Sequence, residues 1–192
     1  CTMFKSIKRP GIALVTIVAI TLSYYAVSIN HAFAAALANV SDTLSTQTIS
    51  TAANHTIVFR TPTGAADTSD TITFTFPAGF NMNSIAFGDV DLAWSAGSQS
   101  NCTAPTYSNN ASIAATPASG TWGAALSGQV LTLSAPSASF ATTIAANACV
   151  QLEIGTNATT GATGDTQIIN PSSAATYEIA IAGAFGDTGS TT

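Results

Sequence analysis

The chain has 192 residues, which is enough for one domain and a targeting segment but too few for two domains of ordinary size. Charged residues make up 7% of it, against about a quarter in ordinary proteins. This low fraction excludes a surface of amphipathic helices, which carry lysine and glutamate on the side that faces solvent. Past residue 34 it carries nine acids and one base, Arg60, a net charge of −8 that excludes binding to nucleic-acid phosphates.

The amino-terminal segment has the order of a secretory signal peptide: basic, apolar, then small residues. Lysine and arginine occur in residues 3–11, residues 12–27 carry no charge, and Ala34 ends a small-x-small site. The apolar run of about 16 residues is shorter than the ~20 that a membrane-spanning helix needs. We therefore predict a signal peptide over residues 1–34, cut between Ala34 and Ala35, and leave open an uncleaved hydrophobic anchor helix.

The same segment also resembles the leader of type IV prepilins. Residues 8–11, Lys-Arg-Pro-Gly, precede the apolar run as the basic end of such a leader does. Pilins usually carry a glutamate five residues after the cleaved glycine, and the corresponding residue here is Thr16. This alternative implies a membrane-tethered, pilin-like subunit that contacts a membrane only through its N-terminal segment.

The clearest element of the body is residues 70–76, in which Ile72, Phe74 and Phe76 alternate with threonines. A period of two in β-favouring residues predicts a strand with one buried face, and Pro77 ends it because proline cannot donate to a ladder. Similar short runs occur along the chain, in the order 39–51, 55–61, 70–76, 85–92, 122–126, 130–133, 149–154 and 177–182. Together they predict an all-β fold, an immunoglobulin-like antiparallel β-sandwich over residues 35–192.

The last residues, 186–192, are rich in Gly, Ser and Thr, and their pattern predicts no strand. A sandwich of this kind would be expected to use one more strand after residues 177–182. We therefore also predict that the domain is truncated at its C-terminal side. The chain would then be a fragment of a longer protein, in which several such modules follow one another.

Past the predicted leader two cysteines remain, Cys102 in the longest loop and Cys149 at the start of an alternating strand. An even pair in an exported domain predicts one disulfide, and only one pairing exists here. That bond would tie the Asn-rich loop to the strand face opposite its apolar residues. Two cysteines and the distant His55 do not have the spacing of a zinc site.

No arrangement of residues predicts catalysis. His55 is the only histidine past residue 34, and the sequence contains no Gly-x-Ser-x-Gly turn of the serine hydrolases. Asp89 and Asp91 place two carboxylates on one side of an extended segment, where calcium would need further oxygen ligands because it takes about six to eight. We therefore expect no enzymatic activity and no cofactor, with calcium at Asp89 and Asp91 as the one metal candidate and solvated acids as the alternative.

Tryptophan and tyrosine side chains offer a surface on which a sugar ring can stack. Trp122 and Tyr177 stand in apolar runs and are expected in the core. Trp94 and Tyr107 flank the long loop and are the candidates for ligand binding. A surface glycan would be the corresponding ligand, which makes a glycan-binding module the alternative to a purely structural one.

Four segments of the body resemble a secreted Thr/Ala-rich β-sandwich module of cell-surface proteins from small-genome bacterial lineages. They are residues 48–64, 70–80, 152–171 and 177–189. The resemblance implies an exported cell-surface or appendage component with a structural or adhesive role. Its partners would be other surface modules or copies of itself, joined through open edge strands that offer unpaired N–H and C=O groups.

Overall fold

The computed structural model describes residues 34–138, 143–161 and 163–192. The predicted signal peptide and its alternatives, apart from Ala34, lie outside these residues. Within them, thirteen strands and one short 3-10 helix, η1 (Phe87–Asp89), make up the regular structure, and no α-helix occurs. The predicted all-β class is confirmed for the described part of the chain.

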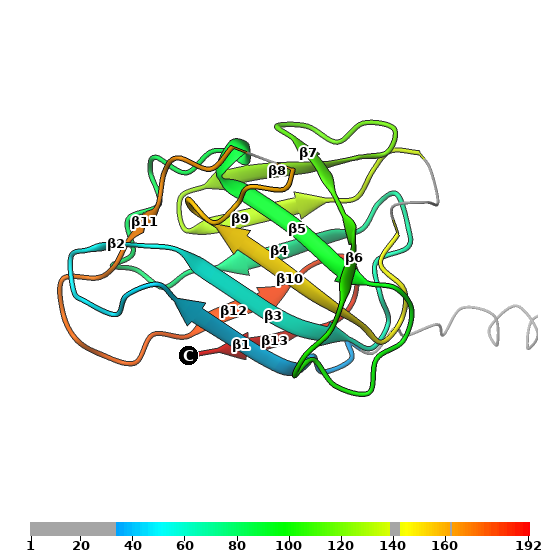
Figure 1. The fold of residues 1–192 in the computed structure, drawn as a ribbon, viewed down its shortest axis with the longest axis horizontal. Coiled ribbons are helices and arrows are strands. Elements are labelled where there is room, and N and C mark those ends of the chain that lie inside the picture. The colour runs from blue at the N-terminus through cyan, green and yellow to red at the C-terminus, as the bar shows by residue number, and fades with distance from the viewer. Residues whose placement is uncertain (1–33, 139–142, 162) are drawn as a thin grey trace, which may run out of the picture. The chain divides into compact units, whose positions relative to one another are not determined.

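Five strands form the first main sheet, in the order β1-β3-β10-β5-β6, and every neighbouring pair is antiparallel (Figure 1). In chain order these strands are β1 (Ala38–Leu44), β3 (His55–Thr61), β5 (Val90–Ser95), β6 (Tyr107–Asn110) and β10 (Ala148–Ile154). Burial alternates strictly along β3, so that one face of this strand lies in the interior. That alternation is what the sequence of residues 55–61 predicts.

Six strands form the second main sheet, in the order β13-β12-β4-β9-β8-β7, and only the β7–β8 pair is parallel. In chain order they are β4 (Thr71–Thr75), β7 (Ser112–Ala114), β8 (Thr121–Ser127), β9 (Val130–Ser134), β12 (Ile179–Ala182) and β13 (Gly189–Thr191). Two short strands, β2 (Ala52–Ala53) and β11 (Ile168–Ile169), pair with each other beside the main sheets.

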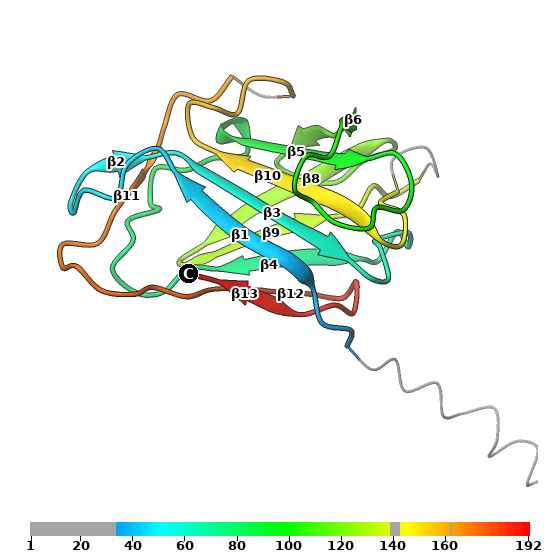
Figure 2. The same ribbon diagram turned by 60° about the horizontal axis from the view of Figure 1, so that its bottom comes forward.

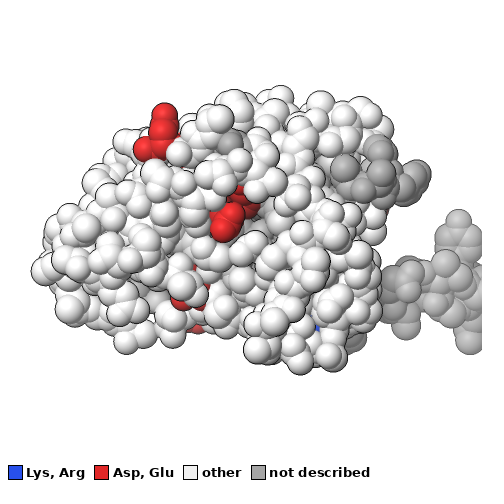
Figure 3. Space-filling model, in the orientation of Figure 1, with Lys and Arg blue, Asp and Glu red and all other residues white. Residues whose placement is uncertain are grey.

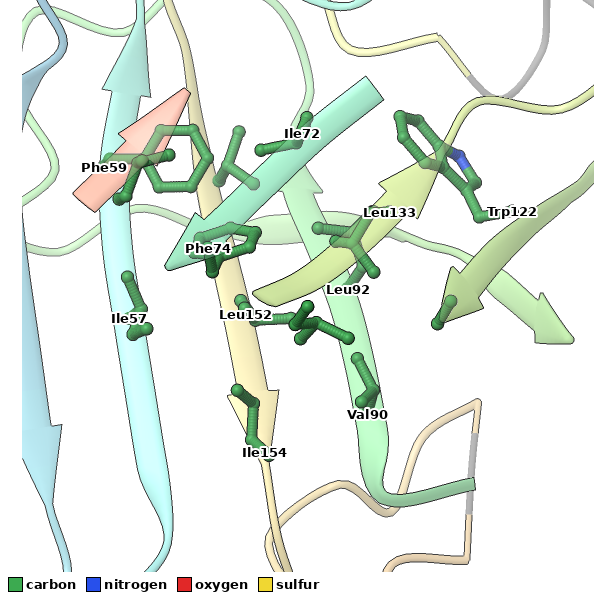
Figure 4. Packing of buried hydrophobic residues seen from close by; sticks show 14 of the residues in the cluster. Ile57, Phe59, Ile72, Phe74, Val90, Leu92, Trp122, Leu133, Leu152 and Ile154 are labelled. Atoms are coloured by element: carbon green, nitrogen blue, oxygen red, sulfur yellow. The ribbon is translucent and has the colours of Figure 1, made fainter. Parts of the chain in front are cut away.

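The apolar faces of the two sheets contribute to one core (Figure 4). Two ring pairs join them: Phe59 lies 6.0 Å from Phe74, and Trp94 lies 6.3 Å from Trp122, measured between ring centroids. All four side chains are at most 3% exposed. The other large inward side chains include Ile57, Ile72, Leu92, Leu131, Leu133, Leu152 and Ile154. The predicted buried face of the strand around Phe74 is thus confirmed.

Just before β1 the chain pairs with the second sheet instead of the first. The Leu37 N–H donates to the Thr188 carbonyl at 2.8 Å, and the Thr188 N–H donates to the Ala35 carbonyl at 2.9 Å, in a parallel bridge that we name the clasp. The register of β1 shifts between Ala38 and Ser41. Such a bulge bends a strand, and here it redirects the chain from one sheet to the other.

The second sheet ends in β13, which the sequence pattern does not predict. Its Gly-Ser-Thr sequence contains no large apolar residue, so that alternation cannot reveal it. It forms because Thr191 pairs with Ile179 of β12, and because Asp187, just before it, accepts hydrogen bonds from the hydroxyl groups of Thr61 and Thr63. The prediction that no strand follows residue 186 is therefore wrong.

Candidate functional site

At one edge of the sandwich, β1 of the first sheet lies beside β13 of the second (Figure 2). Side chains of this edge line a groove made of two cavities. A cavity of about 440 Å³ occupies one part of it, and its lining includes Leu44 and Phe80. A second cavity of about 310 Å³ adjoins the first, because Asp42 and Thr192 line both. We name the two cavities together the edge groove.

An acid and a histidine form a buried pair beside the edge groove. The Nδ1 atom of His55 lies 2.7 Å from Oδ2 of Asp42, and the two side chains are 0% and 2% exposed, respectively. The imidazole ring packs edge-on against Phe76 and Phe80, with centroids 5.4 and 5.6 Å away. The other polar atom of each side chain, Oδ1 of Asp42 and Nε2 of His55, is buried without a hydrogen-bond partner.

Asn170 brings a further acceptor to the same groove. Its amide nitrogen donates to the carbonyl groups of Thr46 and Thr48, both at 3.0 Å, which fixes the orientation of the amide. Its Oδ1 atom is buried and has no partner. The two bonds also hold the segment after β1, which explains why β1 ends at Leu44 whereas the sequence predicts a strand over 39–51.

The larger cavity of the edge groove has an apolar part to its wall, whereas the smaller one is lined mainly by polar residues. The rings of Phe80 and Tyr177 lie 5.5 Å apart, edge to face, and the Tyr177 hydroxyl donates to the Ser173 carbonyl at 2.9 Å. Ile49 lines the groove with 49% of its surface exposed, the largest value for a large apolar side chain among the described residues. Exposed apolar surface beside unpaired buried acceptors is typical of a binding site.

The sequence pattern does not predict the edge groove, although it contains a signal. Asp42 stands between Val40 and Leu44 in the alternating positions of β1 that face inward. His55 opens the inward positions of β3, two residues before Ile57. An acid and a histidine in inward positions of neighbouring strands indicate a buried polar pair, because such residues are seldom fully buried unless they are paired.

The two calcium candidates have another role in the structure. Asp89 accepts hydrogen bonds from the backbone N–H groups of Ala86, Asp165 and Thr166 at 2.9, 3.0 and 3.0 Å. Asp91 accepts them from the N–H groups of Thr160 and Gly161. Both carboxylates therefore bind backbone amides and hold the loop that follows β10 against β5. In residues 34–138, 143–161 and 163–192 no three His, Cys, Asp or Glu side chains gather in a group able to bind a metal.

Three titratable groups in this region have shifted pKa values. Burial by itself would raise the pKa of Asp89, but the backbone hydrogen bonds outweigh it and the pKa is lowered from 3.8. Burial raises the pKa of Glu153 above 4.5, and the charge of Asp91, its cross-strand partner, raises it further. Burial and the charge of Glu153 raise the pKa of Tyr107 above 10.0.

The carboxyl groups of Asp89 and Glu153 should make the stability of the fold depend on pH in opposite directions. Ionised Asp89 stabilises the fold, fully above its ordinary pKa and progressively less as the pH falls through its lowered one. Glu153 behaves in the opposite way. Its protonated side chain contributes fully to stability below its ordinary pKa, and this contribution is lost as the pH rises through the raised pKa. At neutral pH we expect Asp89→Asn to lower the free energy of unfolding by about 1–3 kcal/mol. Glu153→Gln should raise it by about 0.2–1 kcal/mol, because like charges opposite each other destabilise a sheet.

Urea unfolding of both variants at neutral and acidic pH measures these effects. The gain from Glu153→Gln should vanish in acid, where the wild-type carboxyl group is neutral as well. A Glu153→Gln variant that is less stable than the wild type at neutral pH would contradict the assignment of repulsion between Glu153 and Asp91.

The structure separates the two predicted ligand-binding aromatics. Trp94 is 3% exposed and packs on Trp122 in the core, so its ring offers no face to a sugar. Tyr107 is half-buried on β6, opposite Ser95. The expectation that Trp94 and Tyr107 together present an exposed aromatic surface is corrected accordingly, since Trp94 is part of the sandwich interior.

The predicted disulfide is present between Cys102 and Cys149, whose Cα atoms lie 5.7 Å apart. Cys149 is fully buried on β10, on the face opposite Val150. The bond therefore ties the loop after β5 to the outer face of the first sheet, and it points to an oxidising environment outside the cytoplasm.

Comparison with known proteins adds no relative: no family model, no curated protein and no solved structure matches the chain. The resemblance to bacterial cell-surface modules thus stays a prediction. Among the described residues, no helix has the length and apolar character needed to cross a membrane. For the part of the chain that it describes, the structure establishes an all-β fold with two main sheets, one core and one disulfide.

Proposed function

We propose that this chain is an exported, non-enzymatic module with a structural or adhesive role at a bacterial cell surface or in a surface appendage. The order of residue types in residues 1–34 supports export, and the Cys102–Cys149 disulfide fits it, because such bonds persist in oxidising compartments. The observation that carries the role itself is the open edge of β1 beside the edge groove.

The strand order supports an immunoglobulin-like module. Seven strands taken in chain order as A to G are β1, β3, β4, β5, β10, β12 and β13. They occur in the sheets as A-B-E-D and G-F-C, the arrangement of a constant-type immunoglobulin domain. The strands β6 to β9 are an insertion between D and E that extends both sheets. The disulfide joins the loop before this insertion to E rather than B to F, so the support comes from strand order alone.

The edge of β1 suits pairing with a neighbour. It is the longest of the edge strands in the described sheets, with seven residues against four in β6 and three each in β7 and β13. Beyond the clasp, its outer side has no paired strand among the described residues. An open edge of this length can add a strand from another chain through main-chain hydrogen bonds.

A charge on this edge should weaken self-association. Light scattering of the purified full chain from micromolar to millimolar concentration should show dimers or larger multimers. Thr43→Lys adds a charge at an exposed position of β1, and we expect it to raise the concentration needed for association by about tenfold. Thr75→Lys is the matched control, because Thr75 is an exposed threonine on β4, a strand with neighbours on both sides. A chain that stays monomeric, or equal effects of the two variants, would count against assembly through β1.

The N-terminal residue of the exported protein decides among the forms of export. Ala35 at the N-terminus supports cleavage of a signal peptide, and Ile12 supports the pilin-like subunit. An intact leader supports a membrane tether. Recovery of the whole chain from the cytoplasm would contradict export altogether.

The glycan-binding alternative depended on an exposed ring at Trp94. Because Trp94 is buried, that support is gone, and no other observation favours this alternative.

A further inference from the structure

We propose that the edge groove binds an extended peptide segment of a partner protein, with a lysine or arginine side chain of that segment reaching Asp42. The inference rests on the proposed adhesive role and names the chemistry of the partner. Its basis is Asp42, a residue that lines both cavities of the groove. The Asp42 side chain is 2% exposed, and its Oδ1 atom is buried without a hydrogen-bond partner.

Unpaired buried polar atoms gather at this groove. The described residues contain five such side-chain atoms. Two belong to Asp42 and Asn170, which line the groove, and a third belongs to His55, which pairs with Asp42 but lines neither cavity. The unpaired atom of Asn170 is an amide oxygen, which can only accept hydrogen bonds. The unpaired atom of Asp42 is a carboxyl oxygen, which likewise only accepts them when the group is ionised. A buried acceptor without a partner costs free energy, and a carboxylate oxygen costs more than a neutral one. A ligand that brings N–H donors would offset this cost, and a cationic donor would offset it best.

The charge of the chain argues that the cation comes from a different protein. Acidic atoms appear in separate patches on the face drawn in Figure 3, and basic atoms appear at one small spot. Arg60 is the only lysine or arginine past residue 34, and its Nη1 already donates to Oδ1 of Asn147 at 2.7 Å. A second copy of residues 34–192 therefore has no lysine or arginine left to pair with Asp42. A basic partner protein would in addition be attracted by the net charge of −8 on these residues.

The shape of the site suits an extended segment. One rim is the unpaired side of β1, which can add a strand through its main chain. Phe80, Tyr177 and the exposed Ile49 form an apolar part of the wall of the larger cavity, which can contact alternate side chains of such a strand. Cavities of about 440 and 310 Å³ are in the size range that accommodates a few side chains.

The probe is a synthetic hexapeptide, acetyl-Val-Thr-Lys-Val-Thr-Val-amide, with matched peptides that carry norleucine or glutamate in place of the lysine. Binding to the purified full chain is measured by NMR titration. We expect the lysine peptide to bind at least about tenfold more tightly than the norleucine peptide, and the glutamate peptide to bind weakest. Raising the salt concentration should reduce the preference for lysine.

Asp42→Asn should abolish the preference for lysine because it removes the charge. The substituted side chain still has an oxygen that can accept the hydrogen bond from His55. Glu178→Gln is the matched control: it removes an exposed charge from the residue next to Tyr177, and it should leave the preference intact. Should Asp42→Asn fail to fold, Ile49→Ser provides the second arm, because Ile49 is exposed and its loss from the groove wall should weaken binding by at least about threefold.

Equal binding of the lysine and norleucine peptides would overturn the proposal. So would the absence of binding at about 1 mM peptide, or a preference for lysine that survives in Asp42→Asn. These outcomes are distinct from failure of the proposed function. A chain that is retained in the cytoplasm or fails to self-associate, but prefers the lysine peptide, contradicts export or assembly and leaves the groove as assigned.

Discussion

Replacing Phe74 with alanine should lower the free energy of unfolding by about 3–5 kcal/mol. Phe74 is fully buried on β4, where it pairs with Leu131 of β9 and Ile181 of β12. Its ring also meets Phe59 of the opposite sheet. Removing it opens a cavity between the two layers that neighbours on both sheets cannot fill without breaking strand register. The total free energy of unfolding of a domain of this size is about 5–15 kcal/mol, so the variant should be close to unfolding at ambient temperature.

Urea unfolding followed by tryptophan fluorescence measures this loss, since Trp94 and Trp122 are both buried in the same core. Thr75→Ala is the control: the position is exposed on the same strand, and the change should cost less than about 1 kcal/mol. If Phe74→Ala and Thr75→Ala are equally mild, Phe74 does not occupy the interior and the two-layer arrangement fails with it.

The second large effect should come from the disulfide. Substituting both Cys102 and Cys149 by alanine should destabilise the fold by about 3–4 kcal/mol, because the bond closes a loop of 47 residues and restricts the unfolded chain. The loop contains all of β6 to β9. The double variant should therefore lose stability throughout the insertion, and amide hydrogen exchange should rise most in those strands.

Reducing agent supplies the control for the double variant. The wild-type midpoint in urea should fall under reducing conditions to that of the double variant, whereas the double variant should not respond to the reductant. Cys1→Ala should leave the midpoint unchanged in both conditions, because Cys1 is not part of the bond. A wild-type midpoint that is the same with and without reductant would contradict a stabilising disulfide.

The sequence predicts those parts of the fold that depend on local alternation. The inward positions of β3, β4 and β10 follow directly from the apolar residues at every second place, as in residues 70–76. The Cys102–Cys149 pairing follows from counting alone. These features are visible because each depends on the residue itself or on its near neighbours.

The remaining features depend on which distant segments meet. The strand β13 has no apolar signature and exists through pairing with β12. Trp94 flanks a polar loop in the sequence, yet the register of β5 turns it inward against Trp122. The edge groove needs β1, the segment around Asn170 and β13 to come together. Two of the three amide partners of Asp89 lie 76 and 77 residues away. Local pattern can mark an inward acid or histidine, as at Asp42 and His55, but it does not say which distant segments meet.

The clasp determines how the module would bear a mechanical load. The segment before β1 and the segment leading into β13 run in the same direction, so tension applied at Ala34 and Thr192 drags one past the other. The hydrogen bonds made by Leu37 and Thr188 are then stretched simultaneously, instead of opening in succession as in an unzipping hairpin. Once they rupture, the covalent bridge keeps 47 residues from extending, which withholds about 160 Å of contour length from the pulled chain.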